Sequence, residues 1–108
     1  MAENKIIRNQ INLAKENNQN AFNYLLNTYW EDVFSFQLKR TKNESLAEDI
    51  TIESFTKAFE KINTYNEKYI FKTWLITISK KLKQPINNVK VRVMRAKRVL
   101  AEIIKKSS

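Results

Sequence analysis

The chain has 108 residues and contains neither histidine nor cysteine, so it has room for one modest domain and lacks imidazole chemistry, thiolate chemistry and the commonest transition-metal ligands. Residues 1–62 carry eight Lys or Arg against nine Asp or Glu, whereas residues 63–108 carry twelve against two, which places the formal net charge of +9 in the C-terminal part. This asymmetry favours a polyanionic partner such as nucleic acid, with a solvated basic helix as the alternative.

The composition also constrains the backbone. Glycine is absent and Pro85 is the one proline, so tight hairpin turns lack their preferred residue and asparagine is expected at helix caps and left-handed positions. The sequence therefore predicts an all-α fold, a small helical bundle without strands. The opening MAENKIIRNQ has no apolar signal core, and charges interrupt the apolar runs before they reach a membrane-spanning length, so we expect a cytoplasmic protein that does not associate with membranes.

Two helices are expected in the first forty residues. A weak apolar pattern at Ile7, Ile11 and Ala14 indicates a short opening helix that ends in the turn ENNQN. From Ala21 to about Arg40, apolar side chains recur at the three-and-four spacing of one buried helix face.

A third helix is predicted within ESLAEDITIESFTKAFEKI, with Asn43 or Ser45 as its N-cap. Its expected inner face is apolar and consists of Ala47, Ile50, Phe55, Ala58, Phe59 and Ile62. Its expected outer face is a polar, largely acidic stripe of Asp49, Glu53, Thr56 and Glu60. Ile52 borders this stripe, which suggests a docking surface for a basic partner, although from spacing alone an incidental exposed isoleucine is the favoured explanation.

The segment NTYNEKY is expected to be a loop, followed by a fourth helix that begins near Phe71. Core packing is the simplest explanation of the apolar residues on one side of this helix, which are Phe71, Trp74, Leu75 and Ile78. Cations and further rings surround them, namely Tyr65, Lys68, Tyr69, Lys72, Lys80 and Lys81. Rings that stack on unpaired bases, with ammonium groups that hold phosphates, suit a nucleic-acid single strand.

Beyond Pro85, the sequence predicts a last helix with an apolar stripe and a basic face, capped by Asn87 or Asn88. Asn88, Arg92 and Arg95 share one side of it, and Asn and Arg are the side chains that read adenine and guanine edges in a major groove. The alternatives are a basic amphipathic helix packed on the rest of the domain or lying on an anionic membrane. We find no nucleophile–base pair, glycine-rich phosphate loop or metal cluster in the sequence, so we expect neither enzymatic activity nor a cofactor.

These segments combine into a family pattern. The stretch from about Asn20 to Lys80 resembles region 2 of the bacterial RNA polymerase sigma factors of the extracytoplasmic-function (ECF) group, through an aromatic-rich helix, then AEDITIESF, then FKTWL. The segment PINNVKVRVMRAKRVL resembles the recognition helix of region 4 in the same group. The resemblance implies a region 2-like helical domain at residues 1–81 and a remnant of region 4 at residues 82–108.

The resemblance also implies roles for individual residues. It implies a transcription initiation factor that catalyses no reaction, binds core RNA polymerase at the β′ clamp helices, and recognises and melts promoter DNA at the minus-ten element; an anti-sigma factor is a further candidate partner. The polymerase contact would fall on Asp49, Ile52, Glu53 and Thr56. The minus-ten contact would fall on Asn63, Tyr65, Asn66, Lys68, Tyr69, Lys72, Thr73 and Trp74. A minus-thirty-five contact would fall on Asn88, Lys90, Arg92 and Arg95.

The sequence departs from the family pattern at two places. Ile52 stands where the family commonly has glutamine, and ISKK runs almost directly into LKQP, without the linker and the other helices of the region 4 helix-turn-helix. Two other functions therefore remain open. One is a protein-interaction module that occupies the polymerase clamp without initiating transcription. The other is a stand-alone DNA-binding or membrane-surface protein that uses the basic last helix.

Overall fold

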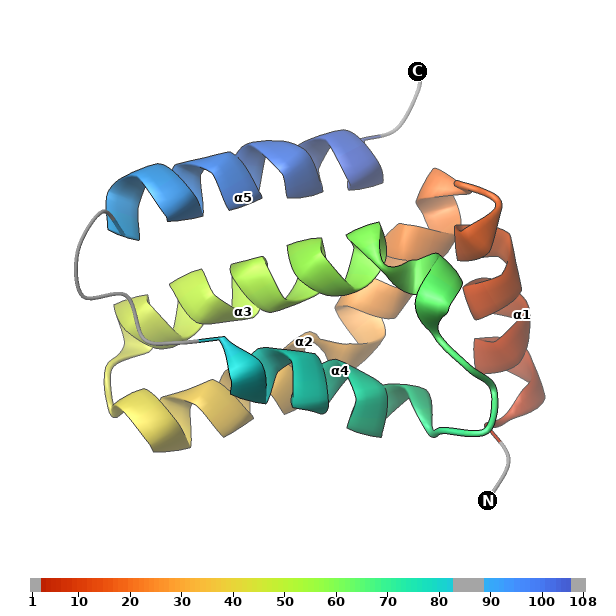
Figure 1. Ribbon diagram of the computed structural model, residues 1–108, viewed down its shortest axis with the longest axis horizontal. Coiled ribbons are helices and arrows are strands. Elements are labelled where there is room, and N and C mark those ends of the chain that lie inside the picture. Colours follow the sequence, from red (N-terminus) through yellow and green to blue (C-terminus); the bar gives the residue numbers. More distant parts are fainter. Residues whose placement is uncertain (1–2, 83–88, 106–108) are drawn as a thin grey trace.

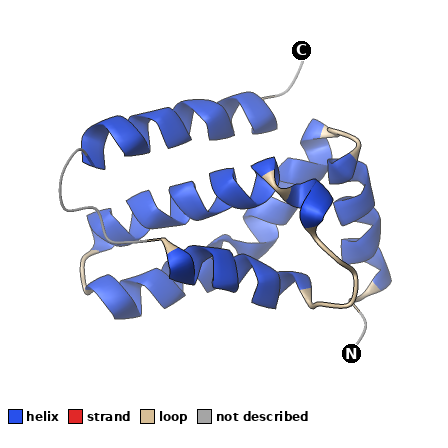
Figure 2. Cartoon of the chain, in the orientation of Figure 1, coloured by secondary structure: helices blue, strands red, loops and turns tan. Residues whose placement is uncertain are grey.

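The computed structural model describes residues 3–82 and 89–105 (Figure 1). Within those ranges the chain is helical and contains no strand (Figure 2). The elements in chain order are α1 (Lys5–Lys15), α2 (Gln19–Thr41), α3 (Glu44–Glu60), the short 3₁₀ helix η1 (Ile62–Thr64), α4 (Phe71–Lys81) and α5 (Val89–Ile104). The predicted all-α fold is confirmed, whereas η1, which joins the end of the predicted third helix to the expected loop, was not anticipated.

Asparagine caps three helices and takes one of the two left-handed positions among the described residues, whereas the other, at the end of α2, is Lys42 with φ of 55°. The Oδ1 atoms of Asn4, Asn18 and Asn43 each accept a hydrogen bond of 2.9 Å from the backbone N–H three residues later, and so cap α1, α2 and α3. Asn43, and not Ser45, is the N-cap of α3. Asn17 adopts the left-handed conformation, with φ of 65°, in the turn between α1 and α2.

The core forms where α1, α3 and α4 pack on α2. The inner face predicted for the third helix is buried throughout, including Ile62 in η1. Aromatic rings link the helices: the centroids of Phe22 and Phe59 lie 4.8 Å apart between α2 and α3, and those of Tyr29 and Phe71 lie 5.4 Å apart between α2 and α4. Tilted ring pairs at these distances add to the free energy gained by burying the rings.

A buried polar cluster fixes α4 against α2 and α3. The Gln37 side-chain amide donates to Ser79 Oγ at 2.6 Å and to the Ser79 carbonyl at 3.1 Å. The Ser54 hydroxyl lies 2.7 Å from both Ser79 Oγ and the Ile50 carbonyl oxygen. Because an unpaired polar group in the core would cost free energy, the cluster specifies how α4 aligns with its two neighbours.

The last helix, α5, packs lengthwise on α3 (Figure 1). Among the side chains of α5 that the structure describes, those of Val93, Ala96 and Leu100 are buried, in agreement with the apolar stripe predicted for this helix. At its C-terminal end, the Asn23 side-chain amide of α2 donates to the Ile104 carbonyl at 2.8 Å. The cap expected at Asn87 or Asn88 lies outside the described residues.

Candidate functional site

The loop before α4 is built on Tyr65. This ring is buried, with 4% of the residue exposed, and its centroid lies 5.3 Å from that of Phe71 and 5.2 Å from that of Trp74. The Tyr65 hydroxyl donates to the Tyr69 carbonyl, and Lys15 Nζ donates to the Tyr65 carbonyl at 3.1 Å. Burial raises the pKa of the Tyr65 phenol. Tyr65 therefore supports the loop from inside and does not present its ring to solvent.

The outer surface of the same loop carries the exposed members of the predicted minus-ten set. They are Asn63, Asn66, Lys68, Tyr69, Lys72 and Thr73. Tyr69 is 61% exposed, and Trp74 is half-buried beside the core. Asn66 Oδ1 accepts a hydrogen bond of 2.9 Å from the Lys68 N–H, which stabilises the turn. The structure thus presents the exposed ring of Tyr69 at the start of α4, with Lys68 and Lys72 exposed beside it in the sequence and Lys72 Nζ 3.5 Å from Asp32 Oδ1.

The N-terminal segment holds this helix start in place. Ile70 is the N-cap of α4 and offers no capping side chain. Instead, Glu3 Oε2 accepts a hydrogen bond of 2.7 Å from the Phe71 N–H. A carboxylate at a helix N-terminus interacts favourably with the helix dipole. Nothing in the sequence indicated Glu3, because the contact joins residues 68 positions apart.

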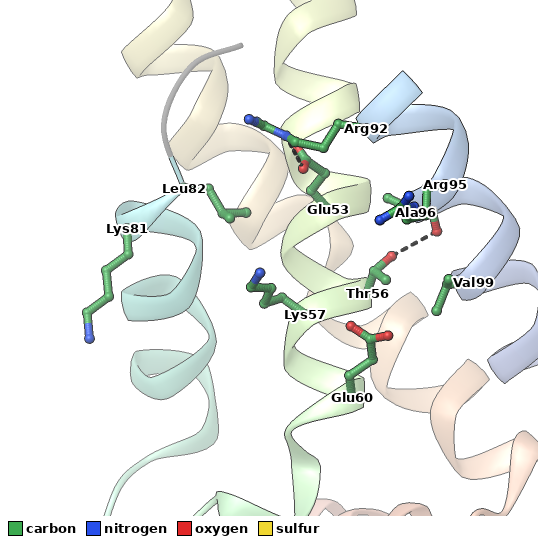
Figure 3. A pocket seen from close by; sticks show the side chains of 10 residues that line it. All are labelled: Glu53, Thr56, Lys57, Glu60, Lys81, Leu82, Arg92, Arg95, Ala96 and Val99. Carbon is green, nitrogen blue, oxygen red and sulfur yellow. Dashed lines mark hydrogen bonds and ion pairs between the residues drawn. The ribbon is translucent and has the colours of Figure 1, made fainter. Parts of the chain in front are cut away.

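The last helix, α5, covers part of the predicted polymerase-binding set on α3 and leaves the rest partly accessible. Asp49 and Ile52 are half-buried, whereas Glu53 and Thr56 are buried. Arg92 of α5 donates from Nε to Glu53 Oε2 at 2.6 Å and from its Nη2 to Glu53 Oε1 at 2.9 Å (Figure 3). These hydrogen bonds raise the pKa of the Arg92 guanidinium. The Thr56 hydroxyl donates to the Ala96 carbonyl of α5 at 3.0 Å.

A groove of about 570 Å³ lies between α3, the end of α4 and α5 (Figure 3). Its lining includes Glu53 and Thr56 from the predicted polymerase set, and Arg92 and Arg95 from the predicted minus-thirty-five set. The structure therefore brings together two sets that the sequence treated as separate sites. Lys90 belongs to α5, and Asn88 lies outside the described residues.

Two structural features are absent from the part of the chain that the structure describes. Over residues 3–82 and 89–105, no group of three or more acidic side chains is arranged to hold a metal ion. Within the same ranges, no helix combines the length and the apolar character needed to cross a bilayer.

Comparison with known proteins finds a family match over most of α2 and the whole of α3 and α4. The family model "Sigma-70 region 2" matches residues 25–84, more than half of the chain. The ECF RNA polymerase sigma factor SigW of Bacillus subtilis is 29% identical over 77 residues, which cover 71% of this chain and 41% of SigW. The ECF RNA polymerase sigma factor SigM of the same organism is 36% identical over 52 residues, which cover 48% of this chain and 31% of SigM.

The matched part thus spans less than half the length of either curated relative, and no solved structure gives a significant match. The family model covers the helices that carry both the loop surface and the α3 face. The chain belongs to the sigma-70 region 2 family, with ECF sigma factors among its relatives.

Proposed function

We propose that this chain acts in transcription initiation as a sigma-type factor, which binds core RNA polymerase and contacts the minus-ten element of promoter DNA. The match of residues 25–84 to sigma-70 region 2 is the observation that carries this proposal. The exposed loop surface at the start of α4 agrees with it, because the family resemblance assigns DNA contacts to the same residues.

The loop surface suits a single strand whose bases are unstacked. Tyr69 offers a free ring face, while Lys68 and Lys72 are exposed close to it in sequence. Stacking of one base on an aromatic ring contributes about 1–3 kcal/mol, and the lysines would add a salt-dependent phosphate contact. Tyr65 and the Glu3 contact hold the loop in shape before DNA arrives, which lowers the entropic cost of binding.

The polymerase contact is proposed on the outer face of α3. Asp49 and Ile52 are partly accessible there, and the acidic side chains of this face suit a basic partner. Glu53 and Thr56 belong to the same face but are engaged by α5. A minus-thirty-five contact through Asn88, Lys90, Arg92 and Arg95 would require α5 to leave α3, because Glu53 holds the Arg92 guanidinium.

The proposal is tested by assembling the chain with core RNA polymerase and measuring binding to a promoter fragment whose minus-ten segment is held open. Tyr69→Ala should weaken DNA binding about tenfold or more, since it removes the exposed ring. Tyr24→Ala is the matched control, because Tyr24 is an exposed tyrosine of a different element, α2, and is not a member of the predicted minus-ten set. Equal effects of the two substitutions would reject the loop surface as the DNA contact.

A second function is favoured by the position of α5. Because α5 packs on α3 and its Arg92 is held by Glu53 of α3, the chain as described does not present a free recognition helix. A module that occupies the polymerase without starting transcription agrees with this arrangement. Transcription from a promoter that the chain recognises would exclude this second function, whereas polymerase binding with inhibition of other sigma factors would support it.

A further inference from the structure

We infer that α5 is an internal competitor for the polymerase-binding face of α3, and that it must leave this face before a partner helix can occupy it. The inference rests on the proposed function, since it concerns the same face of α3. It goes further in naming the element that regulates the face and the chemistry of the partner that displaces it.

The contact of α5 with α3 uses the groups that a partner would need. Both carboxylate oxygens of Glu53 accept hydrogen bonds from Arg92, and the Glu53 side chain retains only 9% exposure. The Thr56 hydroxyl is directed to the Ala96 carbonyl. A second ligand cannot form the same bidentate pair with Glu53 while Arg92 holds it. Occupation by α5 and by a partner is therefore mutually exclusive at Glu53.

The contacts that α5 makes with α3 indicate which kind of partner helix could bind the same face. It pairs an arginine with Glu53, brings a small residue, Ala96, close enough for its carbonyl to reach Thr56, and buries the apolar side chains of Val93 and Leu100. The partner that fits the same face is a basic amphipathic helix with an arginine or lysine at the position of Arg92. Such a helix on the polymerase would displace α5, because it would form the same ion pair with Glu53 and the same apolar packing on α3.

Two features would allow α5 to detach while the other helices stay packed. It is a peripheral helix whose outer face is exposed, with Val91 at 65% and Met94 at 62%. The polar cluster of Gln37, Ser54 and Ser79 joins α2, α3 and α4 without α5. A helix that contributes one face to the edge of a core opens at lower cost than the core itself.

The test uses the full chain and unseats α5 by a change on α5 alone. Arg92→Glu places a carboxylate against Glu53, so the pair becomes repulsive. Arg98→Glu is the matched control, since it makes the same charge change at an exposed position of the same helix that does not line the groove. Hydrogen exchange of the backbone amides reports whether α5 is docked, and binding to core RNA polymerase without DNA reports whether the face is available.

We expect Arg92→Glu to speed exchange in α5, to leave α2, α3 and α4 protected, and to tighten polymerase binding about tenfold, because a larger fraction of the chain is competent to bind. Arg98→Glu should change neither quantity. Ala96→Asp is the second variant, because it places a charge within the contact and should have the same two effects.

The possible failures are distinguishable. Faster exchange in α5 with unchanged or weaker polymerase binding would overturn the competition and leave the proposed function standing. Unchanged exchange in both variants would also overturn it, because these contacts would then not hold α5. Absence of polymerase binding by the wild type and by every variant would remove the proposed function and the inference together.

Discussion

The buried cluster of Gln37, Ser54 and Ser79 allows a quantitative prediction about what holds α4 in place. Ser79→Ala removes the hydroxyl that lies 2.6 Å from the Gln37 amide nitrogen and 2.7 Å from Ser54 Oγ. Both donors keep a second acceptor, since Gln37 still reaches the Ser79 carbonyl at 3.1 Å and Ser54 reaches the Ile50 carbonyl at 2.7 Å. The loss should therefore be about 1–2 kcal/mol, near the lower end of the cost of an unsatisfied buried group.

The coupling between the two side chains is the sharper quantity. Gln37→Leu alone removes both hydrogen bonds at a residue that is 1% exposed, and should cost about 1–3 kcal/mol. In the Ser79→Ala background, Gln37 has already lost its hydrogen bond to Ser79 Oγ, so Gln37→Leu then removes only the remaining hydrogen bond to the Ser79 carbonyl. The double variant should therefore be more stable than the sum of the single effects by about 1 kcal/mol.

Urea unfolding followed by far-UV circular dichroism measures all of these variants on one scale. Ser35→Ala serves as the control, because Ser35 is an exposed serine of α2, and should change stability by no more than about 0.5 kcal/mol. An effect of Ser79→Ala equal to that of Ser35→Ala, or strict additivity in the double variant, would show that the cluster does not hold the three helices together.

Three further predictions concern the loop before α4 and the tyrosines. Glu3→Gln should destabilise the protein by about 0.3–1 kcal/mol and speed hydrogen exchange at the Phe71 amide, because it removes a charge from the start of α4. Unchanged exchange at the Phe71 amide would show that Glu3 does not cap α4 in solution. Phe71→Ala should lower the free energy of unfolding by about 3–5 kcal/mol, because Phe71 is fully buried. Tyr69→Ala should lower it by less than about 0.5 kcal/mol, because Tyr69 is 61% exposed. Similar losses for the two variants in thermal or urea unfolding would contradict the placement of the loop. Burial raises the pKa of Tyr29 and of Tyr65, so the folded chain holds these phenol protons more tightly than the unfolded chain. The free energy of unfolding should therefore be fully retained below pH of about 10 and fall above it, and Tyr29→Phe should reduce the fall. Urea midpoints that stay constant into the alkaline range would refute this prediction.

Local patterns were sufficient to predict most of the helices. The spacing of Ile7, Ile11 and Ala14 indicated α1, and all three are buried in the structure. Asn43 was one of two candidates for the N-cap of α3 and occupies that position. These features depend on residues within a few positions of one another, where helix periodicity and capping chemistry act directly.

The contacts that shape the candidate site were not predictable in this way. Glu53 and Arg92 each lie on a polar helix face, and periodicity assigns such faces to solvent without showing that two of them meet. Their separation of 39 positions leaves no local signal. The capping role of Glu3 had no sequence signal either, since it depends on how the N-terminal segment passes the start of α4. The sequence thus indicates which faces are polar, and the tertiary packing decides which of them remain accessible.

Binding of the full chain to core RNA polymerase, compared between wild type and Asp49→Lys at fixed salt, tests the sigma-type function most directly. Asp49 belongs to the proposed contact but takes no part in the pair between Glu53 and Arg92, so its reversal perturbs the face without altering that pair. Glu31→Lys, on an exposed part of α2, controls for the change in net charge. We predict tight binding by wild type and by Glu31→Lys, and binding at least about tenfold weaker for Asp49→Lys, because like charges would face each other across the contact. Equal binding by all three proteins would contradict the assignment of α3, and no binding by the wild type would contradict the sigma-type function itself.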